Sequence, residues 1–200
     1  MSKKKSIAVA IVLLLVLVVG GLLAYFTDTD TKTNTFTLGN NIEISLTETW
    51  DSSDGLGIHP GAVVSKKPAV KNDSTTTPAY VFMKVEVPCY ATTGTTVNAP
   101  LFTFTAKSGW TLINNTPAPN TSTKTITYIY AYGSSTAMTE LAKGATTPTL
   151  FDSVTLAPTL THAQKATAPA TTDIVITGYG IQTDNLSSTN PATIFALFNS

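Results

Sequence analysis

Residues 79–87, AYVFMKVEV, are the most informative stretch for the fold. The odd positions from 81 to 87 carry Val, Met, Val and Val, whereas the even positions carry Phe82, Lys84 and Glu86. Successive side chains of a β-strand point to opposite faces, so this alternation predicts a strand with one face in a hydrophobic core. We expect this strand to lie at the centre of a sheet.

The same period of two recurs on both sides of this stretch. In residues 42–50, Ile42, Ile44 and Leu46 alternate with polar residues, which predicts a strand of a sheet with one wet face. Further strands are expected over residues 62–72, 101–106, 110–113, 124–132, 150–156 and 173–182.

Turn and cap residues add local detail to this pattern. Pro68 indicates an edge position or a bulge within residues 62–72. Residues 101–106 and 110–113 are expected to form a hairpin around Lys107-Ser108-Gly109. Two short helices are expected, one over residues 136–143 and one over residues 190–198, with Asn190 as its N-cap.

The composition agrees with a β protein. Threonine fills 38 of the 200 positions, and β-branched and aromatic residues suit the pleated surface of a strand. Seven to nine short strands without a strand–helix–strand rhythm indicate an all-β, antiparallel, jelly-roll-like β-sandwich with short helices. The strand order stays open, because jelly-roll and Greek-key connections share this pattern.

The N-terminus reads as an export leader that would form a hydrophobic helix. Lys3, Lys4 and Lys5 precede an apolar run over residues 7–26, as in a secretory signal peptide. Cleavage is expected between Ala24 and Tyr25. The run is also long enough to span a bilayer, so an uncleaved anchor is the alternative. In both cases the remainder of the chain is expected outside the cytoplasm, secreted or at the cell surface.

We therefore expect a signal peptide over residues 1–24, an extended strand over residues 25–38 and a β-sandwich domain over residues 39–200. The extended strand has threonine at every odd position from 27 to 37, and its first half offers no aliphatic face for burial. It either forms an edge strand of its own sandwich or is donated to another copy. The residues expected to carry donation are Tyr25, Phe26, Thr27, Thr29, Thr31, Thr33, Thr35 and Phe36.

Charge and reactive residues exclude several classes of function. The chain has 12 basic residues, all lysine, against 12 acidic ones, so it lacks the basic surface that nucleic-acid binding requires. Contact with a membrane is expected only through an uncleaved leader. The chain has no HExxH motif, and its two histidines, His59 and His162, are far apart in the sequence. The sequence predicts no catalytic residues, no cofactor and no metal site, and no enzymatic activity.

Several segments together resemble the TasA/camelysin family, exported proteins of Gram-positive bacteria with SipW-type signal peptides. The resemblance begins with LLAYFTDTDTKTNTFTLGNNIEISLTE, residues 22–48. It continues in Pro60-Gly61, KKPAVKN at 66–72 and AYVF at 79–82, and returns in YGIQT at 179–183 and NPAT at 190–193.

The resemblance implies a jelly-roll sandwich that is exported and freed from its leader by a signal peptidase. It also implies a structural subunit of extracellular matrix filaments, since members of the TasA branch polymerise by donating an N-terminal strand to the next subunit. The protein's expected partner is therefore a second copy of itself. The camelysin branch is classed as metallopeptidase, and a camelysin-like surface peptidase is one alternative. A membrane-tethered surface or spore-associated protein is another.

Overall fold

The computed structural model describes residues 42–49, 57–114 and 116–199. All of them belong to the second of the two units into which the chain divides, Gly39–Ser200. The leader and the extended strand predicted over residues 25–38 lie outside the described residues. Within the described ranges, no helix has the length and apolar character needed to cross a bilayer.

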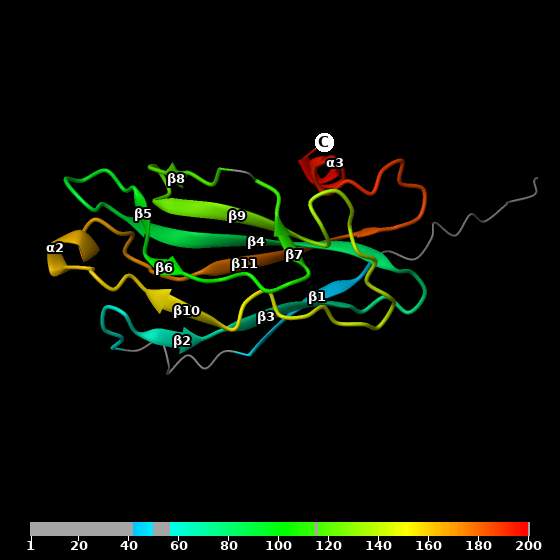
Figure 1. Ribbon diagram of the computed structural model, residues 1–200, viewed down its shortest axis with the longest axis horizontal. Coiled ribbons are helices and arrows are strands. Elements are labelled where there is room, and N and C mark those ends of the chain that lie inside the picture. Colours follow the sequence, from blue (N-terminus) through cyan, green and yellow to red (C-terminus); the bar gives the residue numbers. More distant parts are fainter. Residues whose placement is uncertain (1–41, 50–56, 115, 200) are drawn as a thin grey trace, which may run out of the picture. The chain divides into compact units, whose positions relative to one another are not determined.

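The first layer of the fold is a six-stranded antiparallel sheet with β4 (Ala79–Tyr90) at its centre, as the sequence predicts (Figure 1). β4 pairs with β11 (Val175–Gln182) on one side and with β9 (Thr125–Tyr132) on the other. Three short strands complete this sheet: β5 (Ala99–Pro100) beside β4, and β7 (Trp110–Leu112) and β8 (Pro119–Asn120) beside β9.

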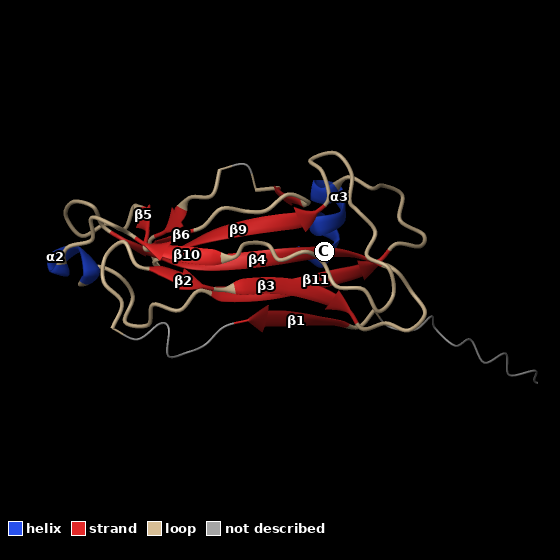
Figure 2. Cartoon of the chain, turned by 60° about the horizontal axis from the view of Figure 1, so that its bottom comes forward, coloured by secondary structure: helices blue, strands red, loops and turns tan. Residues whose placement is uncertain are grey.

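The second layer consists of two small sheets (Figure 2). In one, β1 (Ile44–Thr49) pairs with β3 (Lys67–Asn72). In the other, β10 (Ser153–Leu156) lies between β2 (Val63–Ser65) and β6 (Phe102–Thr103). Only Lys66 separates β2 from β3, so one extended segment contributes to both sheets.

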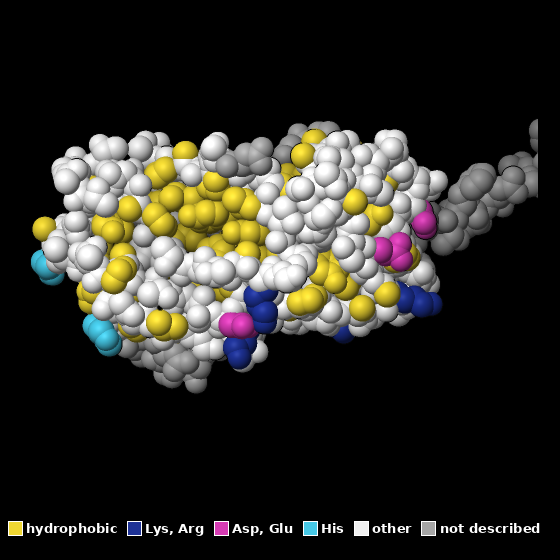
Figure 3. Space-filling view, in the orientation of Figure 1, with side chains coloured by type: hydrophobic (Ala, Val, Ile, Leu, Met, Phe, Trp, Pro, Cys, Tyr) yellow, Lys and Arg dark blue, Asp and Glu magenta, His cyan; other side chains and the backbone are white. Residues whose placement is uncertain are grey.

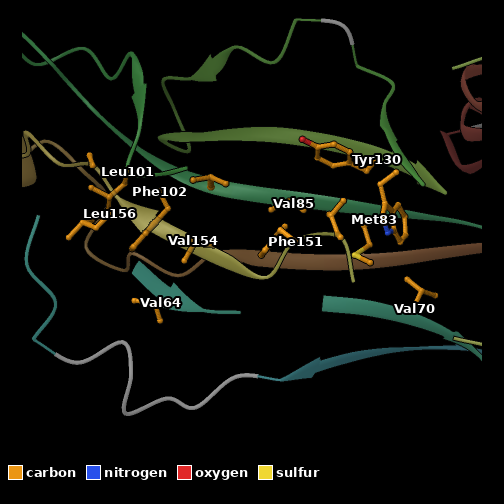
Figure 4. Packing of buried hydrophobic residues seen from close by; sticks show 14 of the residues in the cluster. Val64, Val70, Met83, Val85, Leu101, Phe102, Tyr130, Phe151, Val154 and Leu156 are labelled. Carbon is orange, nitrogen blue, oxygen red and sulfur yellow. The ribbon is translucent and has the colours of Figure 1, made fainter. Parts of the chain in front are cut away.

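The hydrophobic core lies between the two layers (Figure 4). Val81, Met83, Val85 and Val87 of β4 are fully buried there, which confirms the inward face that alternation predicts for residues 79–87. Val64 and Val154 close the core from the second layer. The protein is thus an all-β fold built from antiparallel sheets.

The opposite face of β4 is covered at one end by the C-terminal helix. Asn190 caps α3 (Pro191–Ala196) by accepting hydrogen bonds from the backbone N–H groups of Ala192 and Thr193, as expected. A 3₁₀ turn follows as η2 (Leu197–Asn199). Phe195 and Phe198 pack on Phe82, with ring centroids 5.2 and 5.8 Å away. Lys84 and Glu86 lie on the same face of β4 as Phe82. At Phe82 this face therefore contributes to a second, small hydrophobic core.

The expected hairpin over residues 101–113 is wrong. The turn forms, since the N–H of Trp110 donates to the carbonyl of Lys107 at 3.3 Å. The strands on either side of it diverge, because β6 pairs with β10 in the second layer and β7 pairs with β9 in the first. At this turn the chain therefore passes from the second layer to the first. The residue types that favour such a turn are the same as those that favour a hairpin turn, so the local sequence does not distinguish the two.

The expected helix over residues 136–143 is also wrong. Met138 and Leu141 are buried and bond to distant segments: the N–H of Met138 donates to Thr189, and Leu141 exchanges two backbone hydrogen bonds with Ala79. These long-range bonds replace helical ones. The structure instead has one helical turn that the sequence interpretation missed, α2 (His162–Lys165), opened by a capping box between Thr161 and Gln164.

Candidate strand-acceptor site

β11 is the last described strand on one side of the six-stranded sheet, and its outer edge is called open here because no described strand pairs with it. Along one side it pairs with β4 over all eight of its residues, and no other described strand pairs with its second side. At about 3.3 Å per residue this edge is about 26 Å long. Its sequence, VITGYGIQ, contains no proline and no charged residue, the devices by which proteins commonly protect an edge from strand addition.

Two glycines of β11 let the second layer approach closely. A Cβ atom on Gly180 would lie 2.7 Å from Cγ2 of Ile44, and one on Gly178 would lie 3.5 Å from Cδ1 of the same residue. The side chains of Ile42 and Ile44 therefore occupy the space that side chains of β11 would otherwise fill. This contact holds the start of β1 against the C-terminal half of β11.

β1 and β2 are also the last described strands of their sheets. A cavity of about 690 Å³ opens between these strands and the segment that leads into β11. Its apolar wall comes from both layers and from the connecting loops: Ile58, Val64, Leu101, Phe102, Val154, Leu156, Leu160 and Ile174. Several of these side chains surround the left part of the core in Figure 4. The cavity lies at the start of β11, because it is lined by Thr172, Asp173 and Ile174, which directly precede this strand. We call the two together the acceptor seam.

Charged groups gather around the cavity. Lys66 is largely buried, and its Nζ lies 2.8 Å from a carboxylate oxygen of Glu48 at the end of β1. α2 adds the exposed basic residues His162 and Lys165, and Asp173 adds a carboxylate. The seam thus combines an unpaired backbone edge, an apolar cavity and charges, which suits an extended peptide better than a reaction centre.

Apolar side chains also gather at the surface over the region of β4, β6 and β9 (Figure 3). Among the partly buried aromatic side chains that pack on the core, Phe104 and Tyr128 have ring centroids 5.6 Å apart. Burial raises the pKa of the Tyr128 hydroxyl, so the side chain is neutral at physiological pH. Here the apolar side chains pack on one another beside a sheet edge that is covered, as described below.

The residues that the sequence singled out for cleavage and donation lie outside the described residues. These are Ala24, Tyr25, Phe26, Thr27, Thr29, Thr31, Thr33, Thr35 and Phe36, so cleavage and donation stay predictions. The acceptor seam was not anticipated. The uncharged run VITGYGIQ with its two alternate glycines is the signal that would have indicated it.

Cys89 is poorly suited to nucleophilic chemistry. Its side chain is fully buried against Val97 and Ile126, and its Sγ lies 3.6 Å from the carbonyl oxygen of Val87. Burial raises the pKa of the thiol to about 11, so it is protonated at neutral pH.

Fold and site together define an antiparallel β-sandwich in which one long sheet edge has no partner among the described strands. Comparison with known families shows to which family part of the chain is similar. The model of the family described as camelysin metallo-endopeptidase matches residues 1–97, so this part of the chain is similar to the camelysin family, which confirms the resemblance. The match ends after β4, so the strands from β5 onward lie beyond it. Neither the curated proteins nor the solved structures contain a match.

The family's description implies a metal ion. Within residues 42–49, 57–114 and 116–199, no group of three or more His, Cys, Asp or Glu side chains is arranged to hold one. His162 lines the cavity and His59 does not. The described residues therefore do not fit a catalytic metal site, and no hydrolytic step follows from them.

Proposed function

We propose that this protein is a structural subunit of extracellular filaments, which assembles when the strand over residues 25–38 of one copy adds to the acceptor seam of the next. The open edge of β11 is the observation that carries this proposal. An unpaired strand edge binds an added strand through main-chain hydrogen bonds, and neighbouring pockets select its side chains. The seam offers both features side by side.

Export and leader removal complete the proposal. A signal peptidase that cleaves after Ala24 releases the strand that begins at Tyr25, and the protein is then secreted or held at the cell surface by its own polymer. A head-to-tail contact between identical subunits that does not close on itself produces a filament. The partner is thus a second copy of the chain.

Electron microscopy of two purified chains tests this function. A chain that begins at Tyr25 is expected to form fibres, and a chain that begins at Thr37, which lacks the donated strand, is expected to stay monomeric. Circular dichroism of the shorter chain checks that its sandwich is folded. Fibres of equal abundance from both chains, or none from the longer chain at high concentration, would contradict the proposal.

A surface metallopeptidase is the second candidate, favoured by the description of the matching family. It predicts casein hydrolysis by the pure protein that chelators abolish and that substitution of His59 or His162 reduces. Hydrolysis that persists in both histidine variants, or that separates from the protein on purification, would remove this candidate.

A membrane-tethered surface or spore-associated protein is the third candidate. N-terminal sequencing of the protein from cells distinguishes it from the filament subunit: a start at Met1 or Ser2 indicates tethering, and a start at Tyr25 indicates release. Tethered protein in cells that nevertheless form no fibres would support this third candidate against the first.

A further inference from the structure

Resting on the proposed function, we propose that the open edge of β11 selects its strand by size, and accepts an extended strand of another copy that carries a large apolar side chain opposite Gly178. The strand bonds to the backbone of Ile176, Gly178 and Gly180, and the large side chain covers Leu46. An open strand edge carries N–H and C=O groups at regular intervals, and an extended strand is the element whose own groups match this spacing.

The pairing of β11 with β4 determines which backbone groups of β11 point to the open side. The N–H of Thr183 donates to the carbonyl of Pro78 at 3.4 Å, in the register that pairs Val175 with Glu86. In an antiparallel pair, residues that bond to the partner strand alternate with residues whose N–H and C=O groups point away from it. Since Thr183 bonds towards β4, the even-numbered residues of β11 point to the open side. These are Ile176, Gly178, Gly180 and Gln182.

The hydrogen bonds on the other side of β4 agree with this assignment. Ala79 lies opposite Gln182, and it exchanges two backbone hydrogen bonds with Leu141 rather than with β11. The N–H of Cys89 likewise donates to the carbonyl of Lys124 at 2.8 Å, on the β9 side. Odd-numbered residues of β4 therefore bond away from β11, and the even-numbered residues of β11 that lie opposite them point to the open side.

β1 also has an open side, but a charge protects it. The N–H of Asp73 donates to the carbonyl of Glu43 at 2.8 Å, so the even-numbered residues of β1 point away from β3. Among them, Glu48 directs its side chain into the sandwich, where the carboxylate lies 2.8 Å from Nζ of the largely buried Lys66. An inward-pointing charge is one of the devices that protect an edge from strand addition. β11 has no charged residue, so the added strand is expected there.

The two glycines of β11 leave different amounts of room. Residues directly opposite each other in neighbouring strands point to the same face, so a residue opposite either glycine points into the sandwich. A Cβ atom on Gly180 would lie 2.7 Å from Cγ2 of Ile44 and 3.2 Å from Cγ2 of Ile42, so this space is already filled. On Gly178 the nearest atom would be 3.5 Å away, an ordinary contact. A large side chain therefore fits opposite Gly178.

Leu46 is the apolar surface that this side chain covers. Leu46 lies on the same face of β1 as Ile44, which points into the sandwich, and yet it is 37% exposed. Its Cδ1 lies 3.9 Å from the position of a Cβ atom on Gly178. A large cross-strand side chain that packs over a glycine is a known way to stabilise such a position in a sheet. The partner is therefore an extended strand with a large apolar residue on its inward face.

Hydrogen exchange measured by NMR tests the bonding groups. The chain that begins at Tyr25 exchanges either as monomer or as fibres, which are then dissolved under conditions that stop exchange. We expect the N–H groups of Ile176, Gly178 and Gly180 to exchange about a hundredfold more slowly in fibres, because they gain hydrogen bonds. The N–H of Thr177 bonds to β4 already and should change little.

Two results of this measurement would overturn the proposal. Slower exchange in fibres at Leu46 and Glu48, without a change on β11, places the added strand on β1. Slow exchange of Gly178 in the monomer means that a strand of the same copy covers the edge.

A pair of synthetic peptides tests the selectivity without requiring fibres. Both alternate threonine with valine, and the central valine is replaced by phenylalanine in one and by alanine in the other. Binding to the dilute, monomeric chain is followed by the fluorescence anisotropy of the labelled peptides. We expect the phenylalanine peptide to bind about tenfold more tightly, because it removes a larger apolar area from water.

Variants of the chain connect this preference to Leu46. Leu46→Ala is expected to reduce the preference for the phenylalanine peptide to about threefold or less, because the covered surface is smaller. Val63→Ala is the control, since Val63 is 66% exposed and points away from the core that its neighbour Val64 enters. An unchanged preference in Leu46→Ala, or an equal loss in the control, contradicts the proposal.

A second pair of variants tests the backbone of β11. Gly178→Pro removes an N–H that points to the open side, and should weaken the binding of both peptides by about tenfold. Gly178→Ala keeps this N–H and should weaken binding less. Ile176→Pro replaces Gly178→Pro if circular dichroism shows that the latter does not fold. Unchanged binding to a folded proline variant contradicts the assignment of the bonding groups.

The outcomes separate this inference from the proposed function. Equal affinity of the two peptides for the unsubstituted chain overturns the inference, while strand donation itself stands. Absence of fibres from the unsubstituted chain overturns the proposed function instead, and the peptide measurement still decides whether the edge selects by size.

Discussion

The two edges of the six-stranded sheet are finished in different ways. At the β11 edge, eight uncharged residues form one continuous strand without a described partner on their outer side. At the opposite edge, β9 is covered by β7 at one end and by β8 at the other. Between them the side chain of Asn114 takes the place of a strand: its amide donates to the carbonyl of Thr127 at 2.6 Å and accepts from the N–H of Ile129 at 2.9 Å.

The β9 edge is also tied to the second layer. The indole N–H of Trp110 donates to the carbonyl of Pro148 at 3.0 Å, and the N–H of Lys107 donates to Leu150 at 2.8 Å. Short strands and a side-chain amide thus protect the β9 edge, whereas the β11 edge keeps a form that is suited to strand addition. Under the proposed function, this difference would direct strand addition to one side of the subunit, as a linear polymer requires.

The largest effect is expected from removing the closure of the β9 edge. Trp110→Ala should lower the free energy of unfolding by about 3–5 kcal/mol, because a large buried aromatic side chain is lost. Trp110→Phe keeps most of the packing and loses the hydrogen bond to Pro148, so the free energy of unfolding is expected to fall by only about 1 kcal/mol. Urea unfolding followed by circular dichroism measures both. Similar values for the two variants would show that packing at this edge matters little.

Asn114→Ala is expected to lower the free energy of unfolding by about 2–3 kcal/mol, because two backbone groups of β9 lose their hydrogen-bond partners together. The variant should also self-associate through the newly opened β9 edge, as seen by light scattering. Asn120→Ala is the control: that side chain accepts from Ser122 and Thr123 in an exposed turn, and a loss below about 1 kcal/mol is expected. A monomeric Asn114 variant would argue against the protective role of the amide.

At the β11 edge, Gly180→Ala is expected to destabilise the fold by about 1–3 kcal/mol, since the new Cβ would overlap Ile44. Gly178→Ala meets the same isoleucine at 3.5 Å, an ordinary contact, and should change stability by less than about 1 kcal/mol. Thermal unfolding of the two variants side by side provides the measurement. Equal effects would mean that β1 does not lie against β11 as described.

The smallest effect concerns an exposed ion pair near the β9 edge. A hydrogen bond from Lys107 lowers the pKa of the Asp152 carboxyl from 3.8. A carboxyl whose pKa is lowered on folding stabilises the protein above its unfolded-state pKa, and this contribution disappears as the pH falls through the folded-state pKa. Asp152→Asn should therefore be slightly less stable than the unsubstituted chain at pH 6, and the difference should vanish at pH 2. A difference that persists at pH 2 would point to a cause other than charge.

Local periodicity predicted much of the fold because it reports on burial. The inward valines of β4 and the α3 cap at Asn190 follow from side-chain alternation and capping chemistry, which depend on neighbouring residues. The turn at Lys107-Ser108-Gly109 is an example of what local periodicity cannot predict, namely which strands pair. Its residues are suited to a turn in either setting, and whether the following strand pairs with the preceding one depends on segments about twenty to fifty residues away.

The acceptor seam could not be predicted from the sequence, for the same reason. The threonine pattern predicts only a strand-forming segment over residues 25–38, which lies outside the described residues. Nothing local to Asn114 distinguishes an amide that bonds to β9 from one in a loop, and the cavity is assembled from β2, β6, β10 and the approach to β11.

The sequence alone determined that the chain forms antiparallel strands with defined faces, because alternation and composition are properties of neighbouring residues. Only the tertiary structure decided which sheet edge is covered and which has no partner among the described strands. That outcome depends on how strands distant in the sequence pair, and on whether a side chain such as Asn114 or a partner strand satisfies the backbone groups left at each edge.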